Sequence, residues 1–65
     1  MSLDSYTTEQ LQQLIKDLQV LRYADLSLSA TRLINDVRNS DNRNAISGAW
    51  TVTIELVRNE LKKRN

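Results

Sequence analysis

Apolar residues recur at helical spacing in three segments of the chain, and polar stretches separate these segments. An apolar stripe at positions i, i+3, i+4 and i+7 is typical of an amphipathic helix with one face in a core. The chain has no proline and one glycine, Gly48, so little interrupts helix formation. The pattern therefore predicts an all-α fold with helices at about residues 8–23, 26–39 and 44–63.

The first predicted helix has the most specific start signal. Thr7 and Gln10 have the identity and spacing of a capping box, in which each side chain accepts a hydrogen bond from the other residue's backbone N–H. Tyr6 and Leu11 occupy the two positions of a hydrophobic staple around that cap. The helix is therefore expected to start after Thr7, with residues 1–5 as a loose lead-in. Its predicted apolar face consists of Leu11, Leu14, Ile15, Leu18 and Leu21.

A change of pattern near residues 23–27 separates the first two predicted helices. Asp25, Ser27 and Ser29 favour helix caps over helix interiors, because their side chains compete for backbone hydrogen bonds. Continuing the first heptad forward would also place Asp25 at an apolar position, which disfavours one long coiled coil. The apolar stripe of the second helix consists of Leu26, Ala30, Leu33, Ile34 and Val37.

A polar run from residue 39 to residue 44 predicts the loop before the third helix, because it is rich in turn and cap formers. Asp41, Asn42 or Asn44 is the expected N-cap of that helix.

The third predicted helix has a wider apolar arc than a surface helix needs. Its apolar residues form two adjacent stripes, offset by about one residue or ~100°. Such a helix is buried on more than one side, either by two neighbours in a bundle or partly by a second copy of the chain. Gly48 and Ala49 are small enough to allow close approach of another helix. The first stripe contains Ile46, Trp50, Ile54, Val57 and Leu61, and the second contains Ala45, Ala49, Val52 and Leu56.

Residues 50–56 also fit a competing interpretation as a β-strand. Apolar and polar residues alternate there, and β-branched and aromatic residues are frequent. A single strand has no pairing partner within this chain, so it would have to pair across a dimer. The following residues 57–64 have a helical pattern, and helix throughout is therefore the favoured prediction.

The length of the chain, 65 residues, limits it to one domain and a small core. A chain of this size buries only ~60% of the surface that its unfolded form exposes. It contains no cysteine and no histidine, so neither disulfides nor thiolate or imidazole metal ligands can reinforce it. These constraints predict a helical hairpin or three-helix bundle that is completed by oligomerisation. No signal peptide or membrane span of ~20 apolar residues is recognisable, so a cytoplasmic protein without membrane contact is expected.

The sequence contains few of the residue arrangements that enzymes use for catalysis. The absence of histidine and cysteine excludes the Ser-His-Asp and Cys-His arrangements. The carboxylate pairs Asp36 with Asp41 and Glu55 with Glu60 are spaced by five residues, which separates them around a helix. Gly48 stands alone, so a phosphate-binding glycine-rich loop is excluded. We therefore expect no enzymatic activity, no metal site and no cofactor.

Protein binding is the function that these patterns favour. The chain is expected to be a homodimer or a subunit that regulates, inhibits or scaffolds a partner protein. The expected contact surface is the broad apolar arc of the third helix, because tryptophan is enriched at interface hot spots. The predicted interface consists of Gly48, Ala49, Trp50, Val52, Ile54, Val57 and Leu61.

Nucleic-acid binding is the alternative function, and it depends on the basic end of the third helix. Positive side chains there can contact phosphates, but they also complement the helix dipole. The formal net charge of +1 is far below the basic excess typical of DNA-binding proteins. The candidate contacts are Arg58, Lys62, Lys63 and Arg64.

Overall fold

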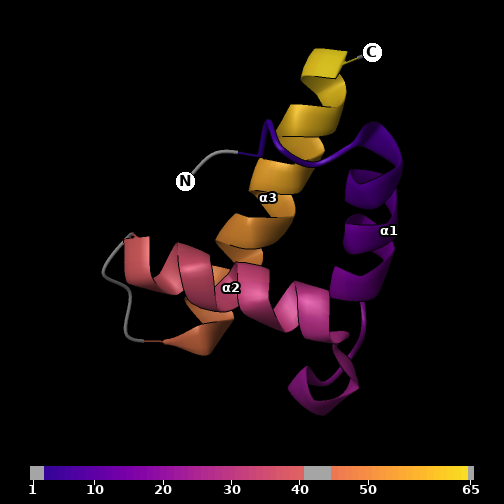
Figure 1. Ribbon diagram of the computed structural model, residues 1–65. Coiled ribbons are helices and arrows are strands. Elements are labelled where there is room, and N and C mark those ends of the chain that lie inside the picture. The colour runs from indigo at the N-terminus through magenta and orange to yellow at the C-terminus, as the bar shows by residue number, and fades with distance from the viewer. Residues whose placement is uncertain (1–2, 41–44, 65) are drawn as a thin grey trace.

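The computed structural model describes residues 3–40 and 45–64, which form a small three-helix bundle (Figure 1). Helix α1 spans Thr8–Leu18, the short 3₁₀ helix η1 spans Tyr23–Asp25, α2 spans Leu28–Ser40 and α3 spans Ile46–Arg64. Helix α3 packs against both α1 and α2, whereas α1 and α2 contact each other less. The all-α prediction is therefore confirmed, while its completion by oligomerisation stays a prediction.

Helix α3 includes the segment for which a strand was the alternative. Residues 50–56 are helical over their whole length, so the strand alternative is wrong. These residues form a helix because a helix can pack one of its flanks against α1 and the other against α2. A strand would have left its backbone without a pairing partner.

The core of the bundle is formed by most of the predicted apolar stripes of α1 and α2 together with one buried line of residues on α3. Helices α1 and α2 provide most of the large side chains, and α3 provides a narrow line of small and β-branched residues. The buried apolar residues are Leu3, Leu11, Leu14, Leu18, Ala30, Leu33, Ile34, Val37, Ala49 and Val57.

Thr53 lies at the centre of the buried face of α3, between the two predicted stripes. The residue is 0% exposed. Its hydroxyl donates a hydrogen bond of 2.7 Å to the carbonyl of Ala49, one turn earlier. This local bond satisfies the hydroxyl, so a polar residue is tolerated inside the core. The buried line of α3 thus takes Val57 from the first predicted stripe, Ala49 from the second, and Thr53 between them, while the other residues of the two stripes lie on its flanks.

The start of α1 confirms the predicted capping box. The Thr7 backbone N–H donates to Gln10 Oε1 at 2.8 Å, and the Gln10 N–H donates to Thr7 Oγ1 at 3.0 Å. Leu3 departs from the expected loose lead-in, since it is only 7% exposed and belongs to the core. The Tyr6 N–H donates to the Leu3 carbonyl at 3.1 Å, and this turn directs Leu3 inward.

The end of α1 corrects the predicted helix 8–23. The helix ends at Leu18, and Gln19 already has a non-helical backbone with φ −92° and ψ 28°. The Leu18 carbonyl accepts a hydrogen bond from the indole Nε1 of Trp50 at 2.8 Å. A distant residue thus satisfies one of the carbonyls that a helix end leaves without a partner. Leu21 consequently leaves the core face and is 99% exposed.

The start of α2 lies two residues later than predicted. Ser27 caps the helix, because its hydroxyl oxygen accepts a hydrogen bond of 3.1 Å from the Ala30 N–H. The same hydroxyl donates to Asp17 Oδ2 at 3.1 Å, which ties the start of α2 to α1. Leu26 precedes the helix and is half-buried against the core.

The predicted boundaries of the third helix agree closely with α3 where they can be compared. Helix α3 begins at Ile46, two residues after the predicted start, and ends at Arg64, one residue after the predicted end. The expected caps Asp41, Asn42 and Asn44 lie outside the described residues. Within the described ranges, no helix combines the length and apolar character needed to cross a membrane.

Candidate interaction surface

The predicted interface on α3 is divided by the fold into buried and accessible parts. Ala49 and Val57 are 0% exposed, because α1, α2 and the N-terminal segment enclose the central line of the helix. They therefore have no accessible surface for a second molecule in this conformation. Gly48, Val52 and Leu61 are half-buried. Val52 and Leu61 pack at the edge of the core, so most of their surface is also occupied by the chain itself.

Trp50 and Ile54 lie on the flank of α3 that faces the end of α1. The Trp50 indole donates its hydrogen bond to Leu18, as described above, and its ring also meets Tyr23 of η1 edge-on. The ring centroids of Trp50 and Tyr23 are 6.3 Å apart at an interplanar angle of 72°. Trp50 thus connects α3 to the end of α1 and to η1, and part of its surface remains accessible.

A shallow groove lies between the end of α1 and the first turns of α3. It has a volume of about 310 Å³ and a mainly apolar lining. Because Trp50 is fixed to Leu18, the two walls of the groove keep a defined separation. Its lining residues are Leu18, Gln19, Val20, Ser47, Trp50, Thr51 and Ile54.

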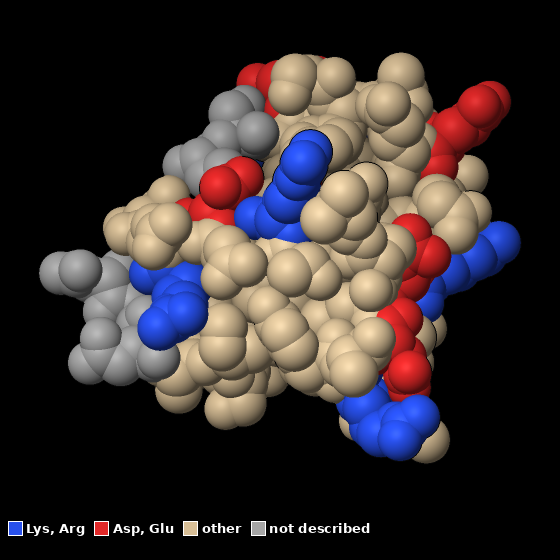
Figure 2. Space-filling view, turned by 60° about the horizontal axis from the view of Figure 1, so that its bottom comes forward, with Lys and Arg blue, Asp and Glu red and all other residues tan. Residues whose placement is uncertain are grey.

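Leu21 follows the groove residue Val20 in the chain, and 99% of its surface is exposed. Its neighbour Val20 lines the groove, and Tyr23 is 41% exposed on the adjacent 3₁₀ helix. We refer to Val20, Leu21, Tyr23, Trp50 and Ile54 as the Leu21 surface. Figure 2 shows the molecule with the bottom of the view in Figure 1 turned forward; the lower middle of this face is uncharged, while a Lys or Arg side chain crosses its upper middle and further charged side chains lie at its left and right.

Sequence patterns placed Leu21 in the core rather than on this surface. The residue continues the heptad of α1, and only the early end of α1 turns it outward. The indication available in the sequence was weak: the polar and cap-forming residues that follow Leu21 allowed an earlier helix end.

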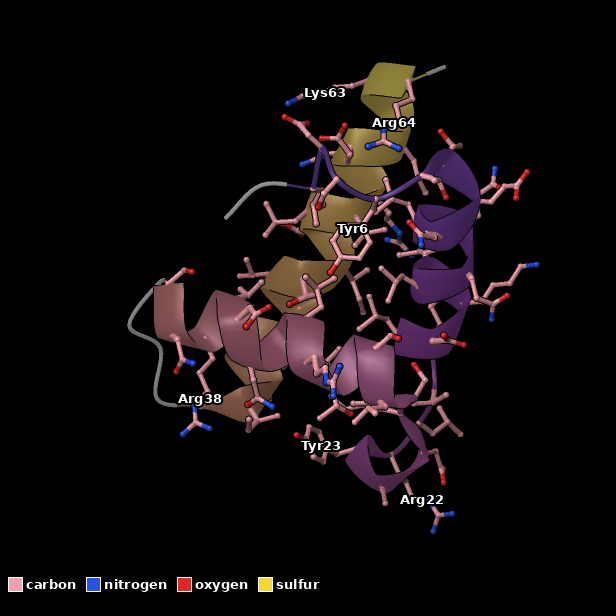
Figure 3. All side chains as sticks on the ribbon, in the orientation of Figure 1. Tyr6, Arg22, Tyr23, Arg38, Lys63 and Arg64 are labelled. Atoms are coloured by element: carbon pink, nitrogen blue, oxygen red, sulfur yellow. The ribbon has the colours of Figure 1, made fainter. Side chains whose placement is uncertain are left out.

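The basic residues at the end of α3 have two different environments. Arg58, Lys62 and Lys63 are exposed. Arg64 is directed toward the N-terminal segment, whereas Lys63 points away from the bundle (Figure 3). The side chain of Arg64 is only 21% exposed and forms an ion pair of 3.2 Å with Glu60.

Arg64 fastens the N-terminal segment to α3. Its Nη1 donates to the Tyr6 carbonyl at 2.7 Å, and its Nη2 donates to the Leu3 carbonyl at 3.1 Å. A longer contact of 3.5 Å joins Nη1 to Thr8 Oγ1. The guanidinium is therefore occupied inside the molecule, so Arg58, Lys62 and Lys63 are the predicted nucleic-acid contacts with exposed side chains.

A second, smaller hollow of about 160 Å³ lies between α1 and the start of α2. Asp17 at its edge accepts hydrogen bonds from Gln13 at 3.0 Å and from Ser27 at 3.1 Å. Its carboxylate is therefore engaged in holding α1 and α2 together. Among the described residues, no three or more His, Cys, Asp and Glu side chains are grouped in a way that could hold a metal ion.

Comparisons of the chain with protein-family models, with curated proteins and with solved structures find no match.

Proposed function

We propose that the chain is a non-enzymatic protein–protein interaction module that contacts its partner through the Leu21 surface. The observation that carries this proposal is the exposure of Leu21, which is 99% accessible and directly follows Val20 in the wall of a groove that Trp50 and Ile54 also line. Isolated exposed leucines are common on proteins. An apolar surface that includes a tryptophan and a tyrosine is instead typical of an interaction site, because these two aromatic residues are enriched at binding hot spots.

The aromatic part of the Leu21 surface, Trp50 and Tyr23, is held in place by contacts within the chain, which favours binding. Trp50 is fixed by its hydrogen bond to Leu18 and by its edge contact with Tyr23. The turn that carries Tyr23 is closed by hydrogen bonds from Asp25 N–H to the Arg22 carbonyl and from Leu26 N–H to the Tyr23 carbonyl. A preorganised surface loses little conformational entropy when a partner binds.

The proposed role is regulation, inhibition or scaffolding by covering a surface of the partner. A chain without cysteine is compatible with a reducing compartment, and the proposal places it in the cytoplasm.

Site-specific photocrosslinking in cells tests this function. A benzophenone amino acid at position 21 is expected to give discrete adducts with protein, whereas the same probe at position 63 is not. Lys63 is a suitable control because it is exposed at the opposite end of the bundle (Figure 3). Equal adduct patterns from both positions, or none from position 21, would refute the proposal.

Nucleic-acid binding is the second candidate, supported by the exposure of Arg58, Lys62 and Lys63 on one end of α3. Phosphate contacts predict an affinity that falls steeply as salt concentration rises. A gel shift at low ionic strength should then be weakened by the K62A/K63A double variant and not by the control Lys16→Ala, which removes an exposed lysine from α1. The absence of any retained complex removes this candidate.

A further inference from the structure

We propose that the hollow between α1 and the start of α2 binds a primary ammonium group, carried by a small organic amine or by a lysine side chain. The hollow shares no residue with the Leu21 surface, so this site lies beyond the proposed function. Its volume of about 160 Å³ is well above the roughly 10–15 Å³ that a single water molecule needs, which leaves room for a ligand of a few non-hydrogen atoms. Its lining residues are Tyr6, Gln10, Gln13, Leu14, Asp17 and Ser29.

The carboxylate of Asp17 is the feature of the hollow that favours a cation. Asp17 is half-buried, and it forms no ion pair with the residues that the structure describes. Its two hydrogen-bond donors are uncharged, since Gln13 Nε2 donates to Oδ1 at 3.0 Å and Ser27 Oγ donates to Oδ2 at 3.1 Å. Each carboxylate oxygen has a second lone pair that can accept a further bond. A cation in the hollow would therefore meet a negative charge in a place where water is partly excluded, which strengthens their attraction.

Two further polar groups of the hollow can accept hydrogen bonds. The Gln13 amide nitrogen is used by Asp17, and the Gln13 Oε1 atom receives no hydrogen bond from the described part of the chain. The Ser29 hydroxyl also lacks a hydrogen-bond partner among the described residues. An ammonium group carries three donors and no acceptor, so it matches these oxygens together with the Asp17 carboxylate. An anion would instead be repelled by Asp17.

Tyr6 gives the hollow an aromatic wall, which also favours a cation. Its ring points from the N-terminal segment into the space between α1 and α2 (Figure 3). The face of an aromatic ring attracts an ammonium ion. The backbone of Tyr6 is fixed from outside the hollow, because its carbonyl accepts a bond of 2.7 Å from Arg64 and its N–H donates to the Leu3 carbonyl at 3.1 Å. Arg64 is therefore a positioning residue for this site and acts on it through the N-terminal segment.

Titration of the intact chain with propylammonium chloride, followed by heteronuclear NMR, tests the proposal. Saturable shifts are expected for the Gln13 side-chain amide and for the backbone amides of Asp17 and Ser29. The expected Kd is about 1–10 mM, because a ligand of so few atoms buries little surface. The neutral probe n-propanol has nearly the same shape and should bind at least about 10-fold more weakly. Sodium chloride at the same ionic strength controls for general salt effects.

A charge-removing substitution tests the role of Asp17. Asp17→Asn keeps an acceptor oxygen but loses the negative charge, so it should weaken propylammonium binding by at least about 10-fold. Glu55→Gln is the matched control, because Glu55 is an exposed acid on α3 and does not line the hollow. Its Kd should equal that of the native chain. Circular dichroism checks that each variant remains helical.

The aromatic wall is tested without any change to Asp17. Tyr6→Phe should bind propylammonium as the native chain does, whereas Tyr6→Leu should weaken binding by about 2- to 5-fold. Arg64→Ala should have an effect of the same size, because release of the N-terminal segment removes Tyr6 from the hollow. Lys63→Ala removes the same charge from the same end of α3 and should leave the Kd unchanged.

Two peptides distinguish the sources of the ammonium group. Acetyl-Gly-Lys-Gly-amide presents one lysine side chain, and the same peptide with an acetylated lysine presents no ammonium group. Binding of the first peptide alone assigns the hollow to a lysine of a protein partner. Exclusion of both peptides, while propylammonium binds, assigns it to a small free amine. Equal binding of the two peptides contradicts recognition of an ammonium group.

The proposal is overturned if propylammonium causes no saturable shift of these residues up to about 100 mM, which would half-fill even a site about 10-fold weaker than expected. Equal binding of n-propanol overturns it too, as does a folded Asp17→Asn protein with the native Kd. If Asp17→Asn does not fold, the comparison of propylammonium with n-propanol decides, because it needs only the native chain.

Discussion

Replacing Arg64 by alanine is expected to detach the N-terminal segment from the bundle. The guanidinium donates to the carbonyls of Tyr6 and Leu3 at 2.7 Å and 3.1 Å, and 21% of its side chain is exposed. Hydrogen bonds from a charged group contribute about 1.5–3 kcal/mol each. Their simple sum overstates the effect, because the segment can detach and let its carbonyls return to water.

The stability that the attached segment contributes sets the upper limit of the loss. Its main contribution is the burial of Leu3, which is 7% exposed. Burying a leucine side chain stabilises a protein by about 1.5–3 kcal/mol. We therefore expect Arg64→Ala to lower the free energy of unfolding by about 2–3 kcal/mol. For a domain of this size, that corresponds to a fall in Tm of roughly 8–24 °C.

Urea unfolding followed by the fluorescence of Trp50, the single tryptophan, measures this loss. Lys63→Ala is the control, because Lys63 is exposed and its removal should change stability by no more than about 0.5 kcal/mol. Arg64→Lys should recover part of the loss, since an ammonium group cannot reproduce the fork of donors that a guanidinium offers.

A double-mutant cycle with Leu3→Ala identifies the cause of the loss. If Arg64 acts by holding the segment, the double variant should be barely less stable than either single variant, because each change already releases the same contacts. Strictly additive losses of unfolding free energy would refute the proposed role of Arg64 in holding the N-terminal segment. An Arg64→Ala protein as stable as the Lys63→Ala protein would refute it too.

Four further substitutions separate the roles of individual residues. Thr53→Val should change the free energy of unfolding in urea by no more than about 1 kcal/mol, because the side chain keeps its shape and the Ala49 carbonyl retains its helical N–H donor. A loss above about 2 kcal/mol would show that the hydroxyl is required. Trp50→Phe should cost about 1–3 kcal/mol by thermal circular dichroism, since the Leu18 carbonyl loses its donor; an unchanged Tm would contradict this role. Leu18→Ala should lower the free energy of unfolding by about 2–5 kcal/mol. Leu21→Ala, measured at a dilute, monomeric concentration, should lower it by no more than about 0.5 kcal/mol. Equal losses would place Leu21 in the core.

Local signals in the sequence were sufficient where the determining contacts are a few residues apart. The capping box of Thr7 and Gln10 is formed as its spacing predicts. Ser27, one of the predicted cap formers, binds the Ala30 N–H at the start of α2. The helical spacing also identified the buried stripes of α1 and α2, because burial of one face repeats with the period of the helix.

The sequence identified the wide apolar arc of α3 correctly, but it did not show which neighbours bury that arc. The pattern allowed burial by two helices or by a second copy. In the fold, α1 and α2 cover the two flanks, and the fully buried central line includes Thr53. A threonine between two apolar stripes carries no sign of burial in sequence, because its hydroxyl is satisfied by a backbone carbonyl that every helix offers.

The sequence by itself determined the helical class, the start of α1 and the stripes that form most of the core. Only the tertiary structure decided where α1 ends, which leucine faces solvent, and what Arg64 binds. These outcomes depend on hydrogen bonds between residues far apart in the chain: Trp50 reaches Leu18, and Arg64 reaches Leu3 and Tyr6. The spacing of apolar residues along one helix shows which face of that helix is buried. It does not show which residues of other helices it contacts, because those contacts depend on how the helices are placed in space.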